Sequence, residues 1–510
     1  MEDVRNEPEL GGEVLIGSGR NRKELHKTRR ILAQVLATVA VSLLVLDLGM
    51  MIAVPTIVIG ELHNAKEGLS LDDYQASWFS SVLLLCQPVG SVLSGCLQAP
   101  LGRKWTMVLV TVPHAVSWYL LHSAQSAAML YVASASMGVG IGFLEAPLLA
   151  YIGEITEPKL RGRLATYSNA NAVLGHLLEF GLGCLLPWRL VMLVSCAVPA
   201  VAFAALCMVP ESPVWLLTKG RKDEAMSALR WLRGWVSAEE VSDEFRALQL
   251  YCEASRDEYK SAWEAELRKS SGYTGVPDSE CDPRPERQPG FVYGLKDLLR
   301  PGILVPMRLI IAYVFFYHAG SLTALRAYMI EVFARLKVPL SPNLLTVVSA
   351  ASQFAGTVTC ICLVHVVGKR ALSLVSMTSC ALCCLLLGAY TYATSWYSLP
   401  VIPLLLFCSL YFSMNVGIAP VPWLLISEMF PTRGRGVAGG VCAASFYIIA
   451  FIVSKTWVNL INAVDLHGCF LFYGLLTSVG VVFVYYCLPE TEGKTLGEIE
   501  KQIASKTRNK

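Results

Sequence analysis

Titratable side chains inside long apolar stretches are the residues of this chain that could do chemistry. They are Asp47, Glu145, His176, Glu179, His318 and Arg326. A charge in the centre of a bilayer costs about 3 kcal/mol or more, so such residues mark substrate paths, proton relays or buried ion pairs. We predict an intramembrane network in which Arg326 neutralises Asp47 and Glu145. Proton exchange at Asp47 and snorkelling of the charged ends are the alternatives.

A second set of charged residues recurs at matching places in the two halves of the chain. Glu154 and Glu428 each stand seven residues before an arginine, and Gly-Arg-Lys at 102–104 is matched by Gly-Lys-Arg at 368–370. We predict that these residues form a cytoplasmic gate whose contacts break and reform as the halves move. Topological anchoring at the membrane surface is the alternative. The set is Arg103, Lys104, Glu154, Arg161, Lys369, Arg370, Glu428 and Arg435.

Motifs for covalent chemistry are missing from the sequence. We find no nucleotide-binding loop, metal cluster or nucleophile with its partners, so we expect no enzyme activity, no cofactor and no metal. The net charge of +3 is too small to suggest a nucleic acid partner. Most of the 16 cysteines lie in apolar stretches and indicate packing.

Composition places these residues in a membrane. The 510 residues are 54% hydrophobic and only 16% charged, with a mean hydropathy of +0.50. A helix needs about 20 apolar residues to cross a bilayer. We therefore predict an all-α membrane protein with twelve transmembrane helices in two bundles of six, near 31–57, 75–98, 105–125, 128–152, 164–187, 190–209, 304–332, 343–367, 371–391, 399–427, 437–461 and 467–488.

A repeated turn divides the chain into two similar halves. Pro-Glu-Ser at 210–212 ends the first half, and Pro-Glu-Thr at 489–491 ends the second, as expected of an internal repeat. Lys and Arg gather in the even-numbered connections, which predicts that both termini are cytoplasmic. The predicted parts are an N-terminal tail (1–30), an N-terminal bundle (31–209), a cytoplasmic helical linker with a mobile loop (210–303), a C-terminal bundle (304–488) and a C-terminal tail (489–510).

Together these motifs resemble the sugar porters of the major facilitator superfamily, and within them the insect facilitated trehalose transporters. The resemblance covers nearly the whole chain. It rests on the charged motifs above, on Trp188-Arg189, on Pro-Glu-Ser-Pro-Val-Trp at 210–215 and on Pro-Val-Pro-Trp at 420–423. The acid that usually stands three residues before each basic motif is replaced by Ala99 and His365, so we expect a weakened cytoplasmic latch.

The resemblance implies a sugar site between the bundles, near the middle of the bilayer. The family's usual glutamine pair in the seventh helix is replaced by Tyr317 and His318. Tyr, His, Asn and Thr can donate to and accept from sugar hydroxyls, and a Trp can stack on a sugar ring. The substrate-binding residues expected on this basis are Asn169, Tyr317, His318, Thr323, Asn415 and Trp423.

The expected function is facilitative transport of trehalose or a hexose by alternating access. Asp47 stands where similar proton-coupled symporters carry an acid, so a proton-coupled sugar symporter is one alternative. A sugar receptor that does not transport is the other. We expect the plasma membrane as the location, and the sequence leaves the oligomeric state open.

Overall fold

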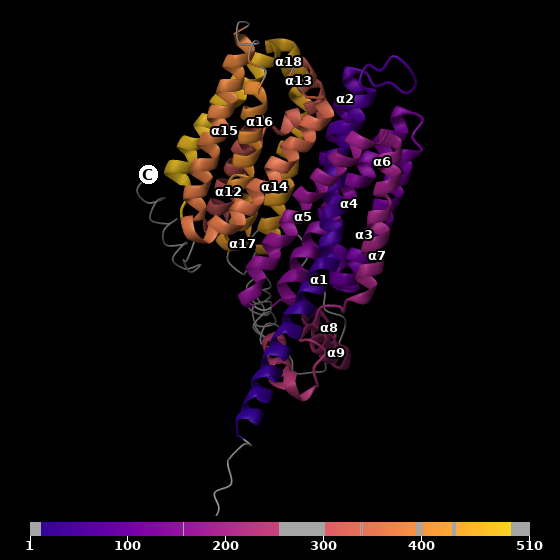
Figure 1. Cartoon of the computed structure of the whole chain (residues 1–510), viewed down its shortest axis with the longest axis vertical. Helices are drawn as coiled ribbons and strands as arrows, with labels where there is room; N and C mark the ends of the chain where they lie inside the picture. The colour runs from indigo at the N-terminus through magenta and orange to yellow at the C-terminus, as the bar shows by residue number, and fades with distance from the viewer. Residues whose placement is uncertain are drawn as a thin grey trace, which may run out of the picture.

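Helices form almost all of the regular structure in the computed structural model, which describes residues 12–156, 158–253, 301–336, 338, 340–393, 399, 401–430 and 435–490. Figure 1 shows the helices lying side by side along one long direction. The first half contains α1 (Gly12–Leu62), α2 (Asp73–Leu101), α3 (Arg103–His122), α4 (Ala127–Ile155), α5 (Pro158–Leu185), α6 (Trp188–Ser195) and α7 (Ala197–Met208).

The second half follows a short stretch of linker helices. The linker contains α8 (Pro213–Thr218), α9 (Lys222–Leu232) and the 3-10 turn η1 (Glu239–Val241). The second half contains α12 (Pro301–Gly320), η2 (Thr323–Tyr328), α13 (Met329–Arg335), α14 (Pro342–Val367), α15 (Lys369–Tyr392), α16 (Val401–Val416), α17 (Val421–Met429) and α18 (Arg435–Cys487). The predicted mobile loop lies outside the described residues.

The all-α membrane fold agrees with the prediction, but the count of twelve is reproduced only in part. Within the described ranges, nine helical stretches are long and apolar enough to cross a membrane. A count of twelve requires adding α3 and α5 and dividing α18 at Asp465. There the backbone leaves helical geometry (φ 57°, ψ 179°) and kinks between two helices.

The membrane-spanning stretches agree with the predicted spans, but some helices extend or break where the sequence did not indicate it. The first helix begins at Gly12, within the predicted N-terminal tail, while its membrane-spanning stretch is Thr28–Leu62. The seventh span is broken after α12, where Leu322 adopts a left-handed conformation with φ 47°. The tenth span divides into α16 and α17 just before its Pro-Val-Pro sequence, because a proline ring cannot continue the preceding helical hydrogen bonds.

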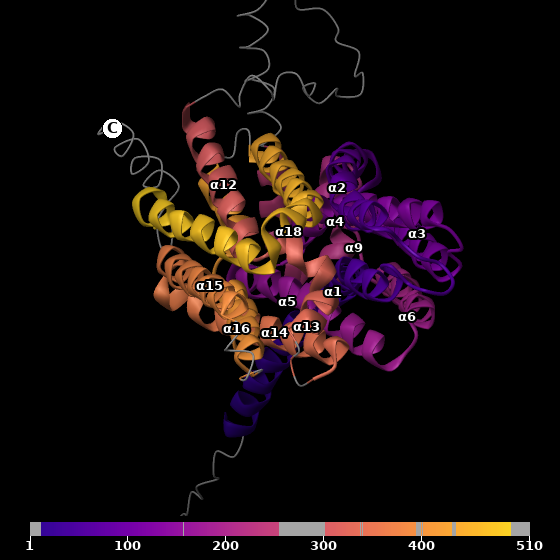
Figure 2. The same cartoon turned by 90° about the horizontal axis from the view of Figure 1, so that it is seen from above.

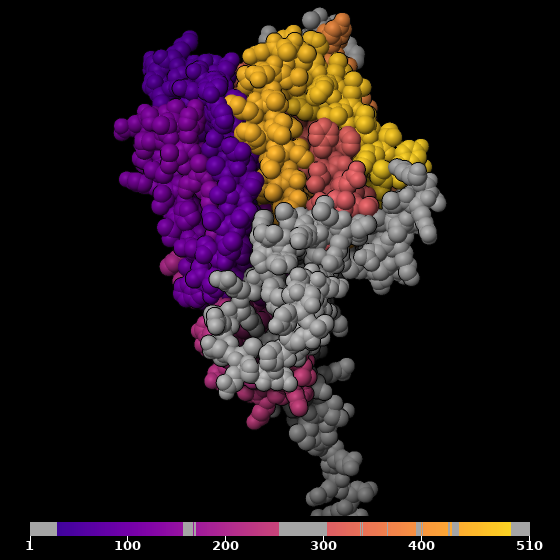
Figure 3. All heavy atoms as spheres, turned by 180° about the vertical axis from the view of Figure 1, so that it is seen from behind, coloured from indigo at the N-terminus to yellow at the C-terminus, as the bar shows by residue number. Residues whose placement is uncertain are grey.

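The two halves pack as separate bundles that meet along a few helices. In the first half α1 lies on α5 and α2 on α4, while in the second half α14 lies on α16 and α15 on α18. Between the halves, α2 contacts α18 and α5 contacts α14. Figure 2 shows the bundles side by side from above, and Figure 3 shows their common border from behind.

Glycines allow the helices within the first bundle to touch backbone to backbone. A Cβ at Gly142 of α4 would overlap the carbonyl of Gln87 in α2, and one at Gly49 of α1 would overlap the carbonyl of Ala172 in α5. Such close approach gives the van der Waals contact that holds helices together in lipid. The bundle is therefore a rigid unit on which side chains can be positioned.

This packing predicts different effects for the same substitution at two sites of α4. Gly142→Ala should lower the stability of the purified protein by about 1–3 kcal/mol, the usual cost of overpacking. Gly153→Ala is the matched control, because a Cβ there has nothing within 4 Å. Thermal unfolding in detergent measures both, and equal melting temperatures for the two variants would contradict the close contact.

Candidate functional site

The repeated Pro-Glu turns cap helices at the end of the molecule that carries α8, which we call the α8 end. Glu211 accepts hydrogen bonds at 3.0 Å from the backbone N–H groups of Arg103 and Lys104 at the start of α3. Glu490 does the same at 3.1 Å for Lys369 and Arg370 at the start of α15. A carboxylate at a helix N-terminus satisfies free N–H groups and complements the helix dipole. In each half, a glutamate therefore caps the N-terminus of the helix that begins with the basic motif.

The glycine before each capped helix makes this contact possible. Gly102 has φ 96° and Gly368 has φ 88°, a conformation that favours glycine. A Cβ at either position would crowd the capping carboxylate, Glu211 or Glu490. The glycines of the Gly-Arg-Lys and Gly-Lys-Arg motifs therefore hold a tight turn against a carboxylate, a role that the sequence alone did not reveal.

The predicted gate residues with described side chains make contacts inside their own half. Arg103 forms an ion pair with Glu154 at 2.9 Å, and Glu154 also accepts a hydrogen bond from Ser212. Lys104 donates to the carbonyl of Cys207 at 3.2 Å. These contacts tie α3 to α4 and to the segment before α8. The side chains of Arg161, Glu428 and Arg435 lie outside the described part of the structure.

In the second half, the basic motif is bound in a similar way. Arg370 donates to the carbonyl of Tyr485 at 2.6 Å, in addition to the backbone cap by Glu490. At the position where the family's acid is missing in the first half, the carbonyl of Ala99 accepts from the indole of Trp215 at 3.0 Å. Whether this end works as a gate stays a prediction.

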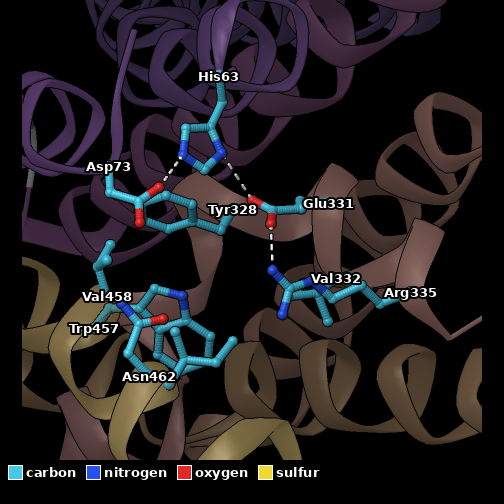
Figure 4. Close-up of a pocket in the computed structure, with 10 residues that line it drawn as sticks. His63, Asp73, Tyr328, Glu331, Val332, Arg335, Trp457, Val458 and Asn462 are labelled. Carbon is cyan, nitrogen blue, oxygen red and sulfur yellow. Dashed lines mark hydrogen bonds and ion pairs between the residues drawn. The ribbon is translucent and has the colours of Figure 1, made fainter. Parts of the chain in front are cut away.

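The opposite end of the molecule carries polar contacts that join the two halves. His63, just after α1, lies 2.8 Å from Asp73 of α2 through Nε2 and 3.1 Å from Glu331 of α13 through Nδ1. Glu331 also pairs with Arg335 at 2.7 Å. Figure 4 shows this chain of four side chains around a pocket of about 40 Å³. We call it the His63 latch, because it bridges the first half to the second.

A lysine on α18 makes a second set of contacts between the two halves at this end. The ammonium of Lys455 lies 4.1 Å from the ring centroid of Trp78 and 4.9 Å from that of Tyr74, both on α2. The hydroxyl of Ser77 donates to the carbonyl of Lys455 at 3.3 Å. Cation–π contacts of this kind contribute roughly 0.5–2 kcal/mol. Each link across the halves is therefore weak enough to break.

Aromatic rings cluster in the second half, around Phe446 of α18. Tyr317 stacks on Phe446 with ring centroids 5.4 Å apart, and Trp423 lies 5.1 Å from the same ring. His318 approaches it at 4.5 Å. We call these four residues the Phe446 cluster. Three of the predicted substrate-binding residues are therefore brought together, although they come from α12 and α17.

Two of the remaining predicted substrate-binding residues, Thr323 and Asn415, have partners within the protein. His318 bonds to the hydroxyl of Thr323 and to the carbonyl of Phe446, each at 3.0 Å. Asn415 donates to the carbonyl of Tyr411 at 3.0 Å and accepts from Thr357 at 3.4 Å. The side chain of Asn169 lies outside the described residues. Sugar contact by these residues stays a prediction.

The predicted charge network has a different arrangement in the structure. Asp47 is fully buried and bonds to Nδ1 of His114 at 2.6 Å and to the indole of Trp118 at 2.8 Å. Glu145 of α4 instead accepts a hydrogen bond from Tyr447 of α18. Among the carboxylates that the structure describes, none forms an ion pair with Arg326. Asp47 and Glu145 therefore have these described partners, and a network of both acids with Arg326 stays a prediction.

Sequence reasoning missed several of these partners. His114 lies in an apolar stretch exactly as the other titratable residues do, so the same criterion could have found it. Nothing in the sequence marks Tyr447 and Trp118 as partners of buried acids, because aromatic residues with one polar atom are common in membrane helices. His63 could not be recognised, since it stands in a polar connection.

The His63 latch predicts a pH-dependent stability. The hydrogen bond that His63 makes to Glu331, followed by the one to Asp73, raises the pKa of His63 above its usual value against the effect of burial. A raised histidine pKa stabilises the latched form below about pH 6.5, and the stabilisation is lost as pH rises through the higher value. The melting temperature of wild type should exceed that of His63→Gln by a few degrees at pH 6.

The same difference should shrink toward zero at alkaline pH. His122→Gln is the matched control, since His122 bonds to the carbonyl of Arg189 inside the first half. A difference between wild type and His63→Gln that is the same at pH 6 and at alkaline pH would refute the latch.

Comparisons with known proteins agree with this geometry. The sequence profile of the family described as "Sugar (and other) transporter" matches residues 34–275 and 286–503. The facilitated trehalose transporter Tret1 of Aedes aegypti is 28% identical over 489 residues, which are 94% of this chain and 56% of that protein. The protein of the same name from Polypedilum vanderplanki is 26% identical over 483 residues, which are 94% of this chain and 89% of that protein.

Solved structures share the fold. The inward-open xylose transporter XylE from E. coli superimposes with a TM-score of 0.68 at 18% identity, over 93% of this chain and 99% of that one. The XylE proton:xylose symporter bound to 6-bromo-6-deoxy-D-glucose gives 0.67 at 18% identity, over 94% and 99%. The relatives are named as transporters and not as enzymes. With a profile match over most of its length, the chain belongs to the sugar (and other) transporter family, on the major facilitator fold.

Proposed function

We propose that this chain is a facilitative transporter that moves a sugar, trehalose or a hexose, by alternating access. The proposal draws on relatives named as facilitated trehalose transporters. The chain spans 56% of the length of the Aedes aegypti protein and 48% of that of the Drosophila grimshawi protein. The activity and the substrate of this chain are therefore proposals, and the proposed class of transported molecule is taken from the family.

The observation that carries the proposal is the nature of the border between the bundles. Each bundle is held internally by backbone contacts at glycines, whereas the halves meet through side chains: apolar core residues of both halves, together with the pairs His63–Glu331 and Lys455–Trp78. These side-chain contacts would break as the halves rock apart there, while each bundle would keep its own backbone contacts. A substrate beside the Phe446 cluster would then be exposed first to one side of the membrane and then to the other.

We also propose an orientation in the membrane and a cellular location for the protein. The cations at the α8 end put that end in the cytoplasm under the positive-inside rule, with both termini on the same side and the His63 latch outside. The plasma membrane is the proposed location. Residues 31–209 and 304–488 are the two moving bundles, and residues 210–303 link them in the cytoplasm.

The substrate gradient alone drives transport in this proposal. Asp47 is bound by His114 and Trp118, which belong to the same bundle, so it acts as a tie between α1 and α3. Proton-coupled symport is the second candidate. It is favoured by the same pair, because an adjoining carboxylate and imidazole can hold a proton inside the membrane.

Uptake by purified protein in liposomes tests the main proposal. Labelled trehalose, glucose and fructose are supplied in turn, with and without a proton gradient, and protein-free liposomes are the control. We expect at least one sugar to equilibrate across the membrane at a rate that a protonophore leaves unchanged. Accumulation above the external concentration that a protonophore abolishes would favour symport. Failure to transport any of them would refute sugar transport.

Asp47→Asn separates the structural role of this residue from a coupling role. The amide keeps an acceptor for Trp118 but loses the charge-assisted bond to His114, which contributes about 1.5–3 kcal/mol. We expect a lower melting temperature and uptake that remains independent of the proton gradient. His114→Gln should cost a similar amount, and the double variant should cost less than the sum of the two, because both remove one interaction. Additive losses would contradict the tie.

A further inference from the structure

His63 is held in the first half by its backbone, and its ring reaches the second half. A short backbone bridge pairs it with Leu71, in the connection between α1 and α2. Nε2 lies 2.8 Å from Asp73 of α2, and Nδ1 lies 3.1 Å from Glu331 of α13. When the halves separate, His63 therefore keeps the carboxylate of Asp73 and loses that of Glu331.

The position of this ring between two carboxylates suits a positive charge. An ionised carboxylate only accepts hydrogen bonds, so each ring nitrogen must carry a hydrogen to bond to the oxygen that it faces. A neutral imidazole has one N–H and can serve one of the two acids, whereas the imidazolium has two. The closed border therefore fits the protonated ring. Loss of a proton from either nitrogen would place a lone pair against a carboxylate oxygen.

The other groups around the ring ordinarily titrate outside the range of a histidine. Arg335 of α13 pairs with Glu331 at 2.7 Å and keeps its charge, while carboxylates titrate at about pH 4. The amide of Asn64 lies 3.3 Å from Nε2. The polar and aromatic residues that line the pocket from η2 and α18 are Tyr328, Trp457 and Asn462. A phenol titrates at about pH 10, and the other two carry no charge. The proton that changes the charge of this border near neutral pH is therefore the one on His63.

Water reaches this group of side chains at the border. The side chain of Asp73 is 56% exposed and that of Glu331 is 31% exposed, while the His63 ring between them is 14% exposed. All three line the pocket of about 40 Å³ that Figure 4 shows. Protons from the aqueous side can therefore exchange with the ring without crossing the membrane.

Protonation and closure are linked, because the closed border offers the imidazolium one carboxylate more than an open border does. A proton that binds more tightly to the closed form shifts the equilibrium toward that form by the ratio of the two proton affinities. The hydrogen bond to Glu331 is the largest cause of the raised pKa of His63, in agreement with this direction. Acid should therefore favour closure, and this effect should be lost as the pH rises through the raised value.

We propose that His63 senses external protons and closes the outer side of the transporter when the medium is acidic. This inference rests on the proposed function, since the His63 latch faces outside only if the α8 end is cytoplasmic. The protonated ring bridges Asp73 and Glu331 and holds the halves together, so substrate cannot enter from outside. The neutral ring releases Glu331, and the halves can separate at this end. The proton regulates the rate of transport and does not drive it.

Distances across the border test the switch without any substrate. Glu67 and Asn459 are exposed residues on opposite halves, and each can be replaced by a keto amino acid that carries a spin label, which leaves the native cysteines unlabelled. Double electron–electron resonance on the full-length protein in lipid nanodiscs then gives the distance distribution at pH 5.5 and at pH 8.5. We expect the ratio of longer to shorter distances to be at least about threefold higher at pH 8.5. The same distribution at both pH values would overturn the proposal.

Variants assign the response to the pair across the border. His63→Gln can still form hydrogen bonds but does not titrate, and Glu331→Gln removes the carboxylate of the second half while His63 and Asp73 remain. Both should give one distance distribution at the two pH values. His122→Gln is the matched control and should respond as wild type does, because His122 contacts the carbonyl of Arg189 inside the first half. A full response in His63→Gln or in Glu331→Gln would overturn the proposal. If one of these two variants does not fold, the other decides.

Uptake by liposomes in which the α8 end faces inward separates this inference from the proposed function. With the internal pH fixed, external pH 5.5 should slow initial sugar uptake at least about threefold relative to pH 8.5 in wild type, and not in His63→Gln. A pH-dependent distance without uptake of any sugar would support the switch and refute sugar transport. Uptake at the same rate at both external pH values would support transport and overturn the switch.

Discussion

A polar or charged group in hydrocarbon must find its partner inside the protein, and the rest of this structure depends on that constraint. It fixes Asp47 against His114 and Trp118, and it brings Tyr447 of the second half to Glu145 of the first. Such contacts are stronger in a low dielectric than at a wet surface.

The same constraint explains why the contacts inside each bundle differ from those at the border between the bundles. Lipid gives helices no hydrophobic reason to associate, so the helices of each bundle depend on close backbone contact at glycines. The halves meet opposite the α8 end through histidine, lysine, carboxylate and aromatic side chains. Side-chain links of this type can be exchanged one at a time, whereas backbone packing cannot change without repacking a whole helix face.

Prediction from the sequence succeeded where local composition decides the outcome. Apolar length gave the spans, and the repeated Pro-Glu turns gave the two halves. It did not show that α1 begins at Gly12, before the apolar stretch, or that Leu322 breaks the seventh span with a left-handed turn. Nor did it show that Asp47 lies against His114 and Glu145 against Tyr447, because chain position alone does not show which helix faces lie opposite each other.

The sequence by itself determined that this is a duplicated helical membrane protein of the sugar porter type, because hydropathy, charge placement and short motifs are local properties that survive in any conformation. Only the tertiary structure decided which residues pair with the charged ones. His63 meets Glu331 across more than 260 positions of the chain, and Glu145 of α4 accepts a hydrogen bond from Tyr447 of α18. Both facts depend on distances between helices, and packing sets those distances.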